Sequence, residues 1–371
     1  MPEPSTPASA RPQGRIAGPV LVVGAGLIGT SVALALGAAG HEVWLADASP
    51  ENVRTASGLG AGTPVPPGRE GDVALAVVAV PPDALGAVVS STLLAHPAAV
   101  VTDVGSVKVQ PLRAVLAGPA ADEAARYVGS HPMAGSERSG PLAASASLFQ
   151  GRPWAVTPHA DADVDAVETV EDVVRVCGAT PVWLTPEEHD RAVARTSHVP
   201  HLLASLVAGR LAEAPEQHLS LSGQGVRDVT RVASGDPALY GQIVAGNADA
   251  VLALLGEVRG ELDRVIAAIG GGDRGGLEAV LARGVDGTRA IPAKHGGPAR
   301  AMSSVWVSVP DTPGELARLF ADAVASGVNI EDIRIDHDPG RPTGLVELVV
   351  DARRSEHLLV SLEERSWVTH R

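Results

Sequence analysis

"VLVVGAGLIGTSVALAL", which begins at Val20, joins a valine-rich run to an alanine- and leucine-rich run through three spaced glycines. Gly24, Gly26 and Gly29 have the G-x-G-x-x-G spacing that connects a strand to a helix in dinucleotide-binding folds. The first glycine allows a tight turn, the second lets the backbone approach a pyrophosphate, and the third lets helix and strand pack closely. The stretch therefore predicts a nucleotide-binding α/β fold.

The residues around these glycines favour NAD as the cofactor. Leu27 and Ile28 open the expected helix, whose free N–H groups and dipole favour phosphates. Asp47 ends the next apolar run, "EVWLAD", where a carboxylate accepts hydrogen bonds from the adenosine ribose and repels a 2′-phosphate. The alternative is a structural glycine turn followed by a surface aspartate. Strand, glycines, helix and aspartate together favour the NAD site.

Short valine-rich runs alternate with helical stretches over residues 19–160: "VLVVGA", "HEVWLAD", "DVALAVVAV", "AAVVTDVGS", "RYVGSH" and "RPWAVTP". Near-continuous valine is typical of strands buried on both faces of a parallel sheet. Strands that alternate with helices predict a Rossmann-type, doubly wound α/β domain. Before it, residues 1–18 are rich in Pro, Ser and Ala and predict a disordered leader.

The rest of the chain predicts two more domains. Residues 161–285 have apolar positions at helical spacing and predict an all-helical domain, with helices over 162–177, 186–214, 222–233 and 237–284. Residues 286–303 contain Gly and Pro without periodicity and predict a linker. Residues 304–371 have the β-α-β-β-α-β order of ferredoxin-like domains. Because this last segment is small for an independent core, we expect pairing with a second copy, as a homodimer.

Composition excludes several classes of function. The formal net charge of −14 argues against binding to nucleic acid. Cys177 is the only cysteine, so no intramolecular disulfide is expected and a reducing compartment is favoured. No stretch reaches the roughly 18 apolar residues of a membrane span, and residues 1–18 lack the apolar core of a signal peptide. We therefore expect a soluble, cytoplasmic protein.

A catalytic histidine is expected where a strand ends. "VGSHPMAGSERSG" places His131 at the carboxyl edge of the sheet, where open α/β sheets bind ligands. "TDVGSVK" brings Ser106 and Lys108 to the same edge, near the nicotinamide end. A histidine can take a proton from a hydroxyl as hydride leaves the same carbon, and a serine hydroxyl can fix its tautomer. A packing histidine is the usual alternative, but the dinucleotide loop favours catalysis.

The predicted helical domain offers further polar candidates. "HDRAVARTSHVPHLLASL" puts His189, His198 and His201 on consecutive turns, although Pro200 marks a kink or a helix start. No third ligand stands at a usual metal spacing, so we expect no metal and a substrate role for His201.

Arg231, in "RDVTR", has two open interpretations. Its guanidinium can fork onto a substrate carboxylate, or it can form an ordinary helix salt bridge with Asp228, three residues earlier.

Taken together, five stretches resemble the prephenate/arogenate dehydrogenase (TyrA) family: "VVGAGLIGTSVALAL", "TDVGSVK", "SHPMAGSERSG", "SHVPH" and "RDVTRVASGDPALY". The tail, "VPDTPGELARLFADAVASGVNIEDI", looks like part of an ACT domain. The resemblance implies NAD-dependent oxidative decarboxylation of prephenate to 4-hydroxyphenylpyruvate in tyrosine biosynthesis. Arogenate, which gives tyrosine directly, is the alternative substrate, and the helical domain is expected to bind substrate and to dimerise.

The resemblance also implies roles for single residues. His131 would hydrogen-bond the C4 hydroxyl of the substrate and Ser106 would orient that histidine. Arg231 would bind the side-chain carboxylate, His201 would line the pocket and Glu137 would gate its entrance. Some relatives carry Trp where this chain has Tyr240, so the pocket wall and the choice between prephenate and arogenate stay open.

The ACT-like tail suggests an amino-acid effector, with tyrosine as the candidate. The residues expected to bind it are Pro313, Gly314, Val328, Asn329 and Ile330. A purely structural dimerisation module is the alternative, and tyrosine could also inhibit at the active site through Arg231.

Two rival functions are weighed against the dehydrogenase. Another two-domain enzyme, such as a 3-hydroxyacid dehydrogenase, would keep the glycine loop but has no reason to keep "SHPMAGSERSG" or "RDVTR". A non-catalytic NAD-binding amino-acid sensor would be favoured by loss of His131, Ser106 or Arg231, and all three are present.

Overall fold

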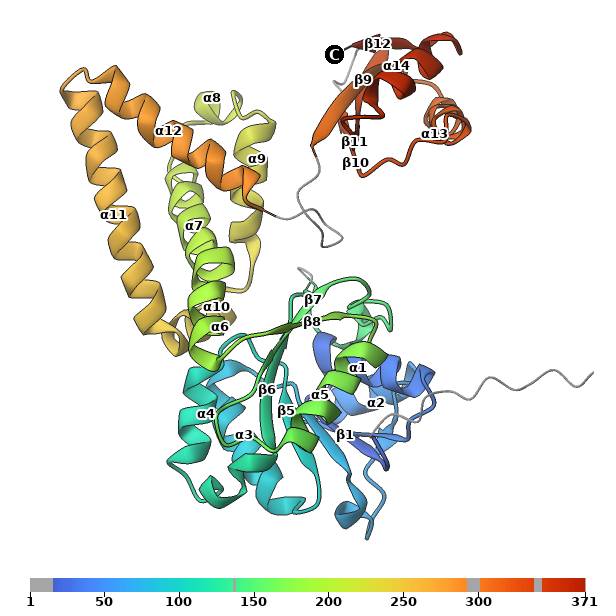
Figure 1. The fold of residues 1–371 in the computed structure, drawn as a ribbon, viewed down its shortest axis with the longest axis vertical. Coiled ribbons are helices and arrows are strands. Elements are labelled where there is room, and N and C mark those ends of the chain that lie inside the picture. The colour runs from blue at the N-terminus through green and yellow to red at the C-terminus, as the bar shows by residue number, and fades with distance from the viewer. Residues whose placement is uncertain (1–15, 136–137, 292–300, 337–341, 371) are drawn as a thin grey trace, which may run out of the picture. The chain divides into compact units, whose positions relative to one another are not determined.

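The computed structural model describes residues 16–135, 138–291, 301–336 and 342–370. It divides into two compact units, Met1–Ile266 and Ala267–Arg371 (Figure 1). Each unit has its own sheet.

The first unit is built on an eight-stranded sheet in the order β3-β2-β1-β4-β5-β6-β7-β8. All neighbouring strands are parallel except β6 and β7, which pair antiparallel, so the last two strands depart from the parallel sheet expected from the sequence. The strands are β1 Val20–Val23, β2 Val43–Ala46, β3 Thr63–Pro64, β4 Leu75–Val78, β5 Val100–Asp103, β6 Tyr127–Pro132, β7 Pro153–Thr157 and β8 Thr180–Trp183.

Helices cover both faces of this sheet, which confirms the predicted Rossmann-type fold. Along β1, Val20 and Val22 point into one apolar cluster and Leu21 into the other, because successive side chains of a strand alternate between faces. Figure 1 shows α1 and α5 on one face and α3 and α4 on the other. The helices of this region are α1 Leu27–Ala38, α2 Pro50–Gly58, α3 Pro82–Ala95, α4 Val109–Leu116 and α5 Val164–Val176, with short 3₁₀ turns at Glu70–Asp72, Ala121–Arg126 and Pro141–Ala143.

Two predicted boundaries of the sheet domain are wrong. Helix α5 places Ala166, Val170 and Val173 in the same apolar cluster as β1, and β8 pairs with β7, so the sheet region continues past residue 160. Strand β8 was missed because "TPVW" is short and contains a proline, which weakens a strand signal. At the other end, Ile16 is 8% exposed and packs in the core, so the predicted leader of residues 1–18 is too long.

The helical region contains α6 Pro186–Val193, a π-helical turn Ala194–His198, α7 Val199–Leu211, α8 Glu216–Leu219, α9 Gln224–Arg231, a 3₁₀ turn Val232–Ser234, α10 Pro237–Gly246, α11 Ala248–Gly270 and α12 Arg274–Arg289. The single helix expected over 237–284 is therefore three helices. It breaks at Asn247 and again at Gly272, whose φ of +67° suits glycine. Helix α12 also runs to Arg289, into the segment predicted as a linker.

Pro200 stands in the first turn of α7, directly after the π-helical turn. Proline has no N–H to donate, and a wider helical turn accommodates that loss. The backbone is helical from α6 through the π-helical turn into α7, so Pro200 lies within a continuous helical run and does not begin a separate helix.

None of the described helices is by itself long and apolar enough to span a membrane. Only α10 and α11 taken together, bent by 95° at their junction, pass a test of length and composition.

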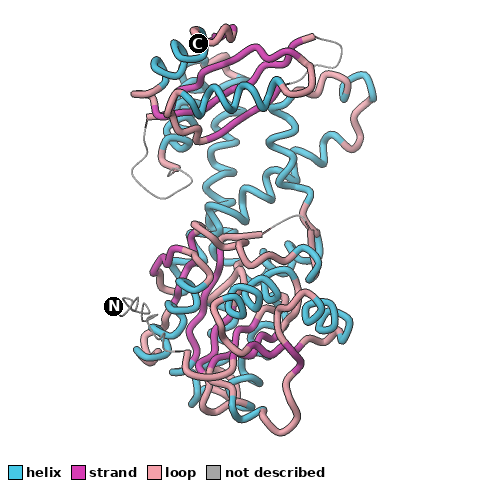
Figure 2. Tube along the Cα trace, turned by 90° about the vertical axis from the view of Figure 1, so that its right-hand side faces the viewer, coloured by secondary structure: helices cyan, strands magenta, loops and turns pink. Residues whose placement is uncertain are grey.

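The C-terminal sheet is antiparallel, with the order β10-β11-β9-β12, and its strands are drawn in magenta in Figure 2. Alternate residues of β9 and β11, such as Val307 and Leu348, share a core with Leu319 of α13 and Leu362 of α14. Both helices therefore cover the same face, as the predicted β-α-β-β-α-β order requires. The elements are β9 Met302–Pro310, α13 Glu315–Ala325, β10 Asp332–Asp336, β11 Thr343–Asp351, α14 Ser355–Glu363 and β12 Val368–His370.

Candidate active site

Of the three glycines in the loop after β1, the middle one has free space where a side chain would begin, and the other two do not. A Cβ at Gly24, where φ is +106°, would collide with the carbonyl of Ala79, and a Cβ at Gly29 would collide with the carbonyl of Gly24. Around Gly26, in contrast, no atom lies within 4 Å of the position of a Cβ. The loop is thus closed where strand and helix pack and open where a pyrophosphate would approach the backbone.

The N-terminus of α1 is suited to an anion. The N-cap residue, Gly26, has no side chain that could bond to the first N–H groups of the helix. The first turn, with the half-buried Leu27 and Ile28, contains no acidic residue. Free N–H groups at such an end favour phosphate. The residues of this loop therefore fit the dinucleotide expected from the sequence.

Asp47 lies beside the glycine loop, directly after β2. Its Oδ2 accepts a hydrogen bond from the backbone N–H of Ala25 at 2.6 Å, and its Oδ1 accepts one from Ser49 at 2.7 Å. The carboxylate is half-buried at the position where an adenosine ribose would lie.

His131 is the penultimate residue of β6, and its ring is held by a residue from α6. Its Nδ1 lies 2.9 Å from Nε2 of His189, with the two rings edge to face at a centroid distance of 5.1 Å. The Nδ1 of His189 in turn lies 2.8 Å from Oδ1 of Asp190. His189 and Asp190 are only 1% and 5% exposed, so this chain of polar groups lies inside the protein.

Asp190 ties three elements together. Its Oδ1 and Oδ2 accept hydrogen bonds from the backbone N–H groups of Lys108 and Val109, both at 2.9 Å, at the start of α4. Its own carbonyl accepts a hydrogen bond from Nδ2 of Asn247 at 2.7 Å, at the junction of α10 and α11. The N–H groups that open α4 give a carboxylate a favourable site, so Asp190 has a fixed position.

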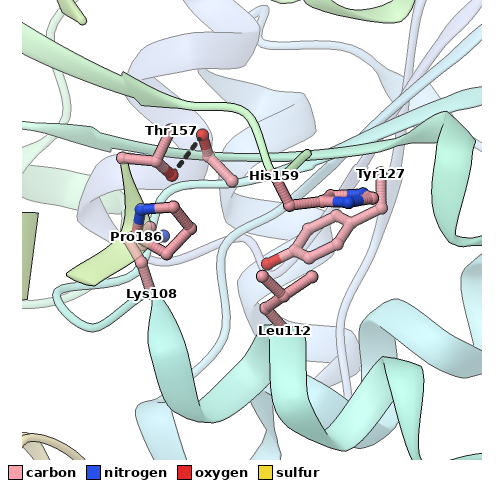
Figure 3. Close-up of a pocket in the computed structure, with 7 residues that line it drawn as sticks. Lys108, Leu112, Tyr127, Thr157, His159 and Pro186 are labelled. Atoms are coloured by element: carbon pink, nitrogen blue, oxygen red, sulfur yellow. Dashed lines mark hydrogen bonds between the residues drawn. The ribbon is translucent and has the colours of Figure 1, made fainter. Parts of the chain in front are cut away.

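The buried lysine of "TDVGSVK" does not face the crevice, in contrast to the expectation. The Nζ of Lys108 bonds the carboxylate of Asp103 and, at 2.6 Å, the carbonyl of Ser130, and its side chain is 1% exposed. The same carboxylate accepts a hydrogen bond from the hydroxyl of Tyr127 at 2.7 Å. Lys108 and Tyr127 line a small cavity with Thr157 and other residues (Figure 3). A buried cation needs a paired anion, and Asp103 supplies it. The pair allows Lys108 to lie in the core rather than at the surface.

The histidines near the site are held neutral. Burial first, and then His189 and the Lys108 ammonium, keep the pKa of His131 well below its usual 6.5. Burial also lowers the pKa of His189, although the hydrogen bond to Asp190 opposes that shift, and it lowers the pKa of His198 to about 4. A neutral imidazole can accept a proton, which is what a general base requires.

A second pair of rings lies in the helical region. His201 stacks on Tyr240 with a centroid distance of 3.4 Å and an interplanar angle of 7°. Gly235 lies against both rings, so that a Cβ there would be 2.8 Å from the tyrosine ring. The Nδ1 of His201 is buried and without a hydrogen-bond partner among the described residues. The substrate role expected for His201 stays a prediction.

The other predicted site residues are placed as follows. Ser106 is half-buried in the loop between β5 and α4, and no hydrogen bond joins it to His131 in the described part of the chain. Arg231 is exposed at the end of α9. Asp228, its alternative partner, accepts a hydrogen bond from Gln224 at 2.9 Å. Glu137 lies outside the described residues.

The predicted effector residues are only partly accessible. Gly314 caps α13 in the left-handed region, with φ +95°, and Pro313 and Asn329 are exposed. Val328 is 7% exposed and packs in the core, with Ile330 against it. The side chains of Val328 and Ile330 pack in the core, so an effector would meet the backbone of these two residues, and the expected binding set stays a prediction.

The sequence did not indicate Asp190 as a site residue, and it did not indicate that His189 contacts His131. A His-Asp pair is visible at positions 189 and 190, but it signals nothing by itself. The contact between His189 and His131 joins residues 58 apart in the chain. No spacing rule predicts such a contact.

The arrangement combines a nucleotide loop and a neutral histidine at one edge of a sheet. Because β1, β2, β5 and β6 are parallel, the glycine loop, Asp47, Ser106 and His131 all follow or end strands at the same edge. No group of three or more His, Cys, Asp and Glu side chains suited to a metal ion occurs among the described residues. The geometry suits removal of a proton beside a bound nicotinamide.

Comparisons with known proteins point to one family. The family model described as "Prephenate dehydrogenase, nucleotide-binding domain" matches residues 32–190, and the model described as "Prephenate dehydrogenase, dimerization domain" matches residues 185–283. "Probable prephenate dehydrogenase NovF" of Streptomyces niveus is 38% identical over 358 residues, which cover 94% of this chain and 98% of the relative.

Solved structures agree. Prephenate dehydrogenase from A. aeolicus, in complex with hydroxyphenyl propionate and NAD⁺, is similar with a TM-score of 0.66 and 25% identity, over 73% of this chain and 97% of that one. Arogenate dehydrogenase from Synechocystis has a TM-score of 0.63 and 26% identity, over 74% of this chain and 100% of that one.

Proposed function

The chain belongs to the prephenate dehydrogenase family, and on that premise we propose that it catalyses the NAD-dependent oxidative decarboxylation of prephenate to 4-hydroxyphenylpyruvate. The observation that carries the proposal is the neutral His131 at the end of β6, at the same sheet edge as an open glycine loop. A base and a dinucleotide loop at one edge are what removal of hydride and proton from one carbinol carbon needs.

Bound NAD⁺ supplies the acceptor for the hydride from C4 of the ring. His131 takes the proton of the C4 hydroxyl, so that the oxygen begins to form a carbonyl as the hydride departs. The bond between the ring and its carboxylate then breaks, CO₂ leaves, and the electron pair makes the ring aromatic. The phenolate oxygen recovers the proton from His131, so the histidine ends the cycle neutral.

The substrate side of the site is proposed from the remaining predicted residues. Arg231 would bind the side-chain carboxylate through charge-assisted hydrogen bonds, and Glu137 would gate the entrance. His201 and Tyr240 form a rigid stacked wall, with the unpartnered Nδ1 of His201 as a further donor or acceptor. Ser106, half-buried in the loop between β5 and α4, is proposed to help orient His131 at the substrate.

The first experiment is the appearance of NADH absorbance with purified protein, offered prephenate and arogenate in parallel and NAD⁺ and NADP⁺ in parallel. Turnover of prephenate with NAD⁺ is the expected result. Turnover of arogenate alone would establish the alternative substrate, for which the similarity to an arogenate dehydrogenase is the argument. No turnover with any of the four combinations would contradict the enzyme and favour the NAD-binding sensor.

Asp47→Asn is expected to weaken NAD binding and to relax the choice of cofactor. The amide has one acceptor oxygen for the N–H groups of Ala25 and Ser49, and it loses the charge-assisted bonds to the ribose, so we expect the KM for NAD⁺ to rise about tenfold. The activity with NADP⁺ should improve relative to NAD⁺, because a 2′-phosphate is no longer repelled. Glu51→Gln, which removes an exposed charge in the first turn of α2, is the control. An unchanged ratio of the two cofactors would remove Asp47 from the ribose site.

The pH dependence follows from the direction of the His131 pKa. A general base is active when deprotonated, and burial holds this pKa well below 6.5. The acid limb of kcat/KM for prephenate is therefore expected below pH 6.5, with full activity through neutral pH. The measurement is kcat/KM at saturating NAD⁺ across the acidic range. A limb centred at or above pH 6.5 would mean that His131 is not the titrating base.

The assembly is proposed to be a homodimer in the cytoplasm. Leu252, Leu262 and Ile266 of α11 are 66%, 54% and 60% exposed, and exposed apolar side chains along one helix are typical of an interface. They lie in the segment that matches a dimerization-domain model.

The buried free Cys177 supports a reducing compartment. Tyrosine is proposed as an effector, either at the C-terminal sheet unit or at the active site.

A further inference from the structure

The hydrogen bonds that join Asp190, His189 and His131 can have only one direction of donation, toward Asp190. Asp190 accepts hydrogen bonds from the N–H groups of Lys108 and Val109, and backbone N–H groups can only donate. A carboxylate held in this way has only acceptor oxygens. The Nδ1 of His189, at 2.8 Å from Oδ1 of Asp190, must therefore carry a proton and donate it.

The tautomer of the next ring follows from that of His189. Burial lowers the pKa of His189, so its ring carries a single proton, which leaves Nε2 as an acceptor. That Nε2 lies 2.9 Å from Nδ1 of His131, so His131 must donate from Nδ1. Its own Nε2 is then the bare nitrogen.

We propose that Asp190 and His189 form a hydrogen-bonded relay that fixes His131 in the tautomer with a bare Nε2, the atom that takes the substrate proton. The two relay residues are positioning residues, because they act on the substrate only through His131. This inference rests on the proposed function for its kinetic consequences, but the tautomer itself does not depend on that function.

The relay also stabilises His131 after it has taken the substrate proton. When His131 gains a proton at Nε2, its Nδ1–H donates more strongly to His189, and the positive charge is stabilised toward the Asp190 carboxylate. The other groups that face the ring are Lys108, from the loop before α4, and His198, from the π-helical turn, and both oppose that charge. Asp103 neutralises Lys108 in the same region. Asp190 is therefore the anion that the relay connects to His131.

A spectroscopic test reads the tautomer directly. The full-length protein is labelled with ¹⁵N-histidine, and the His131 signals are assigned by their loss in His131→Gln. Near neutral pH we expect a protonated Nδ1 and a bare Nε2 for His131, and the same pattern for His189. A protonated Nε2 on His131 would overturn the relay. Wild-type protein that turns over neither substrate would contradict the proposed function and leave this readout intact.

A kinetic series separates the relay from a merely structural role. His189→Phe fills the space but removes the acceptor, and we expect kcat to fall by about 100-fold or more, because the tautomer is no longer imposed. His189→Gln can accept from Nδ1 through its carbonyl oxygen, and it should recover about tenfold of that loss. The KM values for NAD⁺ and prephenate should stay within about threefold of the wild-type values in both variants, since His189 touches neither reactant.

Thr185→Ala is the matched control. Thr185 caps α6 through a reciprocal pair of hydrogen bonds with Glu188, so its removal weakens the helix that carries the relay without touching the relay itself. We expect a Tm lower by a few degrees and an unchanged kcat. A kcat in His189→Phe within threefold of wild type would overturn the relay. Equal losses in His189→Phe and His189→Gln, accompanied by weaker NAD⁺ binding, would show a structural role instead.

Discussion

His131→Asn is expected to lower kcat by about 10³-fold while the Kd of NAD⁺ stays within about threefold. The base is lost, and general acid–base catalysis of this kind contributes about 10²- to 10⁴-fold. The glycine loop, Asp47 and the α1 N-terminus are untouched by the change, because His131 lies on β6. The measurement pairs steady-state kinetics with NAD⁺ titration of the same preparation.

His159→Gln serves as the control for this variant. His159 follows β7, and its Nε2 contacts the carbonyl of Ala124 rather than any residue of the relay. Its kcat should remain near that of wild type. Near-normal turnover in His131→Asn would show that the proton goes elsewhere and that the assigned chemistry is wrong.

Arg231→Ala is expected to raise the KM for prephenate by about 10- to 100-fold, with a smaller effect on kcat. Each charge-assisted hydrogen bond to a carboxylate contributes about 1.5–3 kcal/mol, and the side-chain carboxylate is distant from the reacting carbon. Arg227→Ala is the matched control, because Arg227 lies one turn earlier on α9 and is also exposed. Steady-state kinetics with varied prephenate at saturating NAD⁺ compares the two.

The outcome also decides between the two interpretations of this arginine. If both variants change KM by the same small amount, Arg231 is a surface residue of the helix and another cation binds the carboxylate. A selective effect at Arg231 would place α9 beside the substrate. A Lys at this position should recover part of the affinity, because it retains the charge but not the planar fork.

The nucleotide loop was predictable because its requirements are local. Gly24 must adopt a positive φ, and Gly29 must pack against the backbone of Gly24, so three spaced glycines after an apolar run carry most of the information. Asp47 was predictable for a related reason, since parallel strands end at the same edge of their sheet. The buried valines of the strands were equally clear, because both faces of the sheet are covered.

The limits of the sheet domain were less predictable, because packing rather than composition sets them. Helix α5 has the same amphipathic pattern whether it packs on a sheet or in a helical bundle, and only the position of Val170 in the sheet core shows which. Lys108 illustrates the same point, since a lysine in a loop is expected to reach solvent unless a partner such as Asp103 lies within the core.

The sequence by itself determined the nucleotide-binding fold, the cofactor loop and the histidine at the strand end, because each depends on residues that are neighbours in the chain. Only the tertiary structure decided which nitrogen of His131 is free. That choice depends on His189 and Asp190, which α6 brings to the ring although His189 is 58 positions from His131 in the chain, and on the N–H groups of α4 that hold the carboxylate. A contact of this kind arises from how packed elements meet, and no local pattern encodes it.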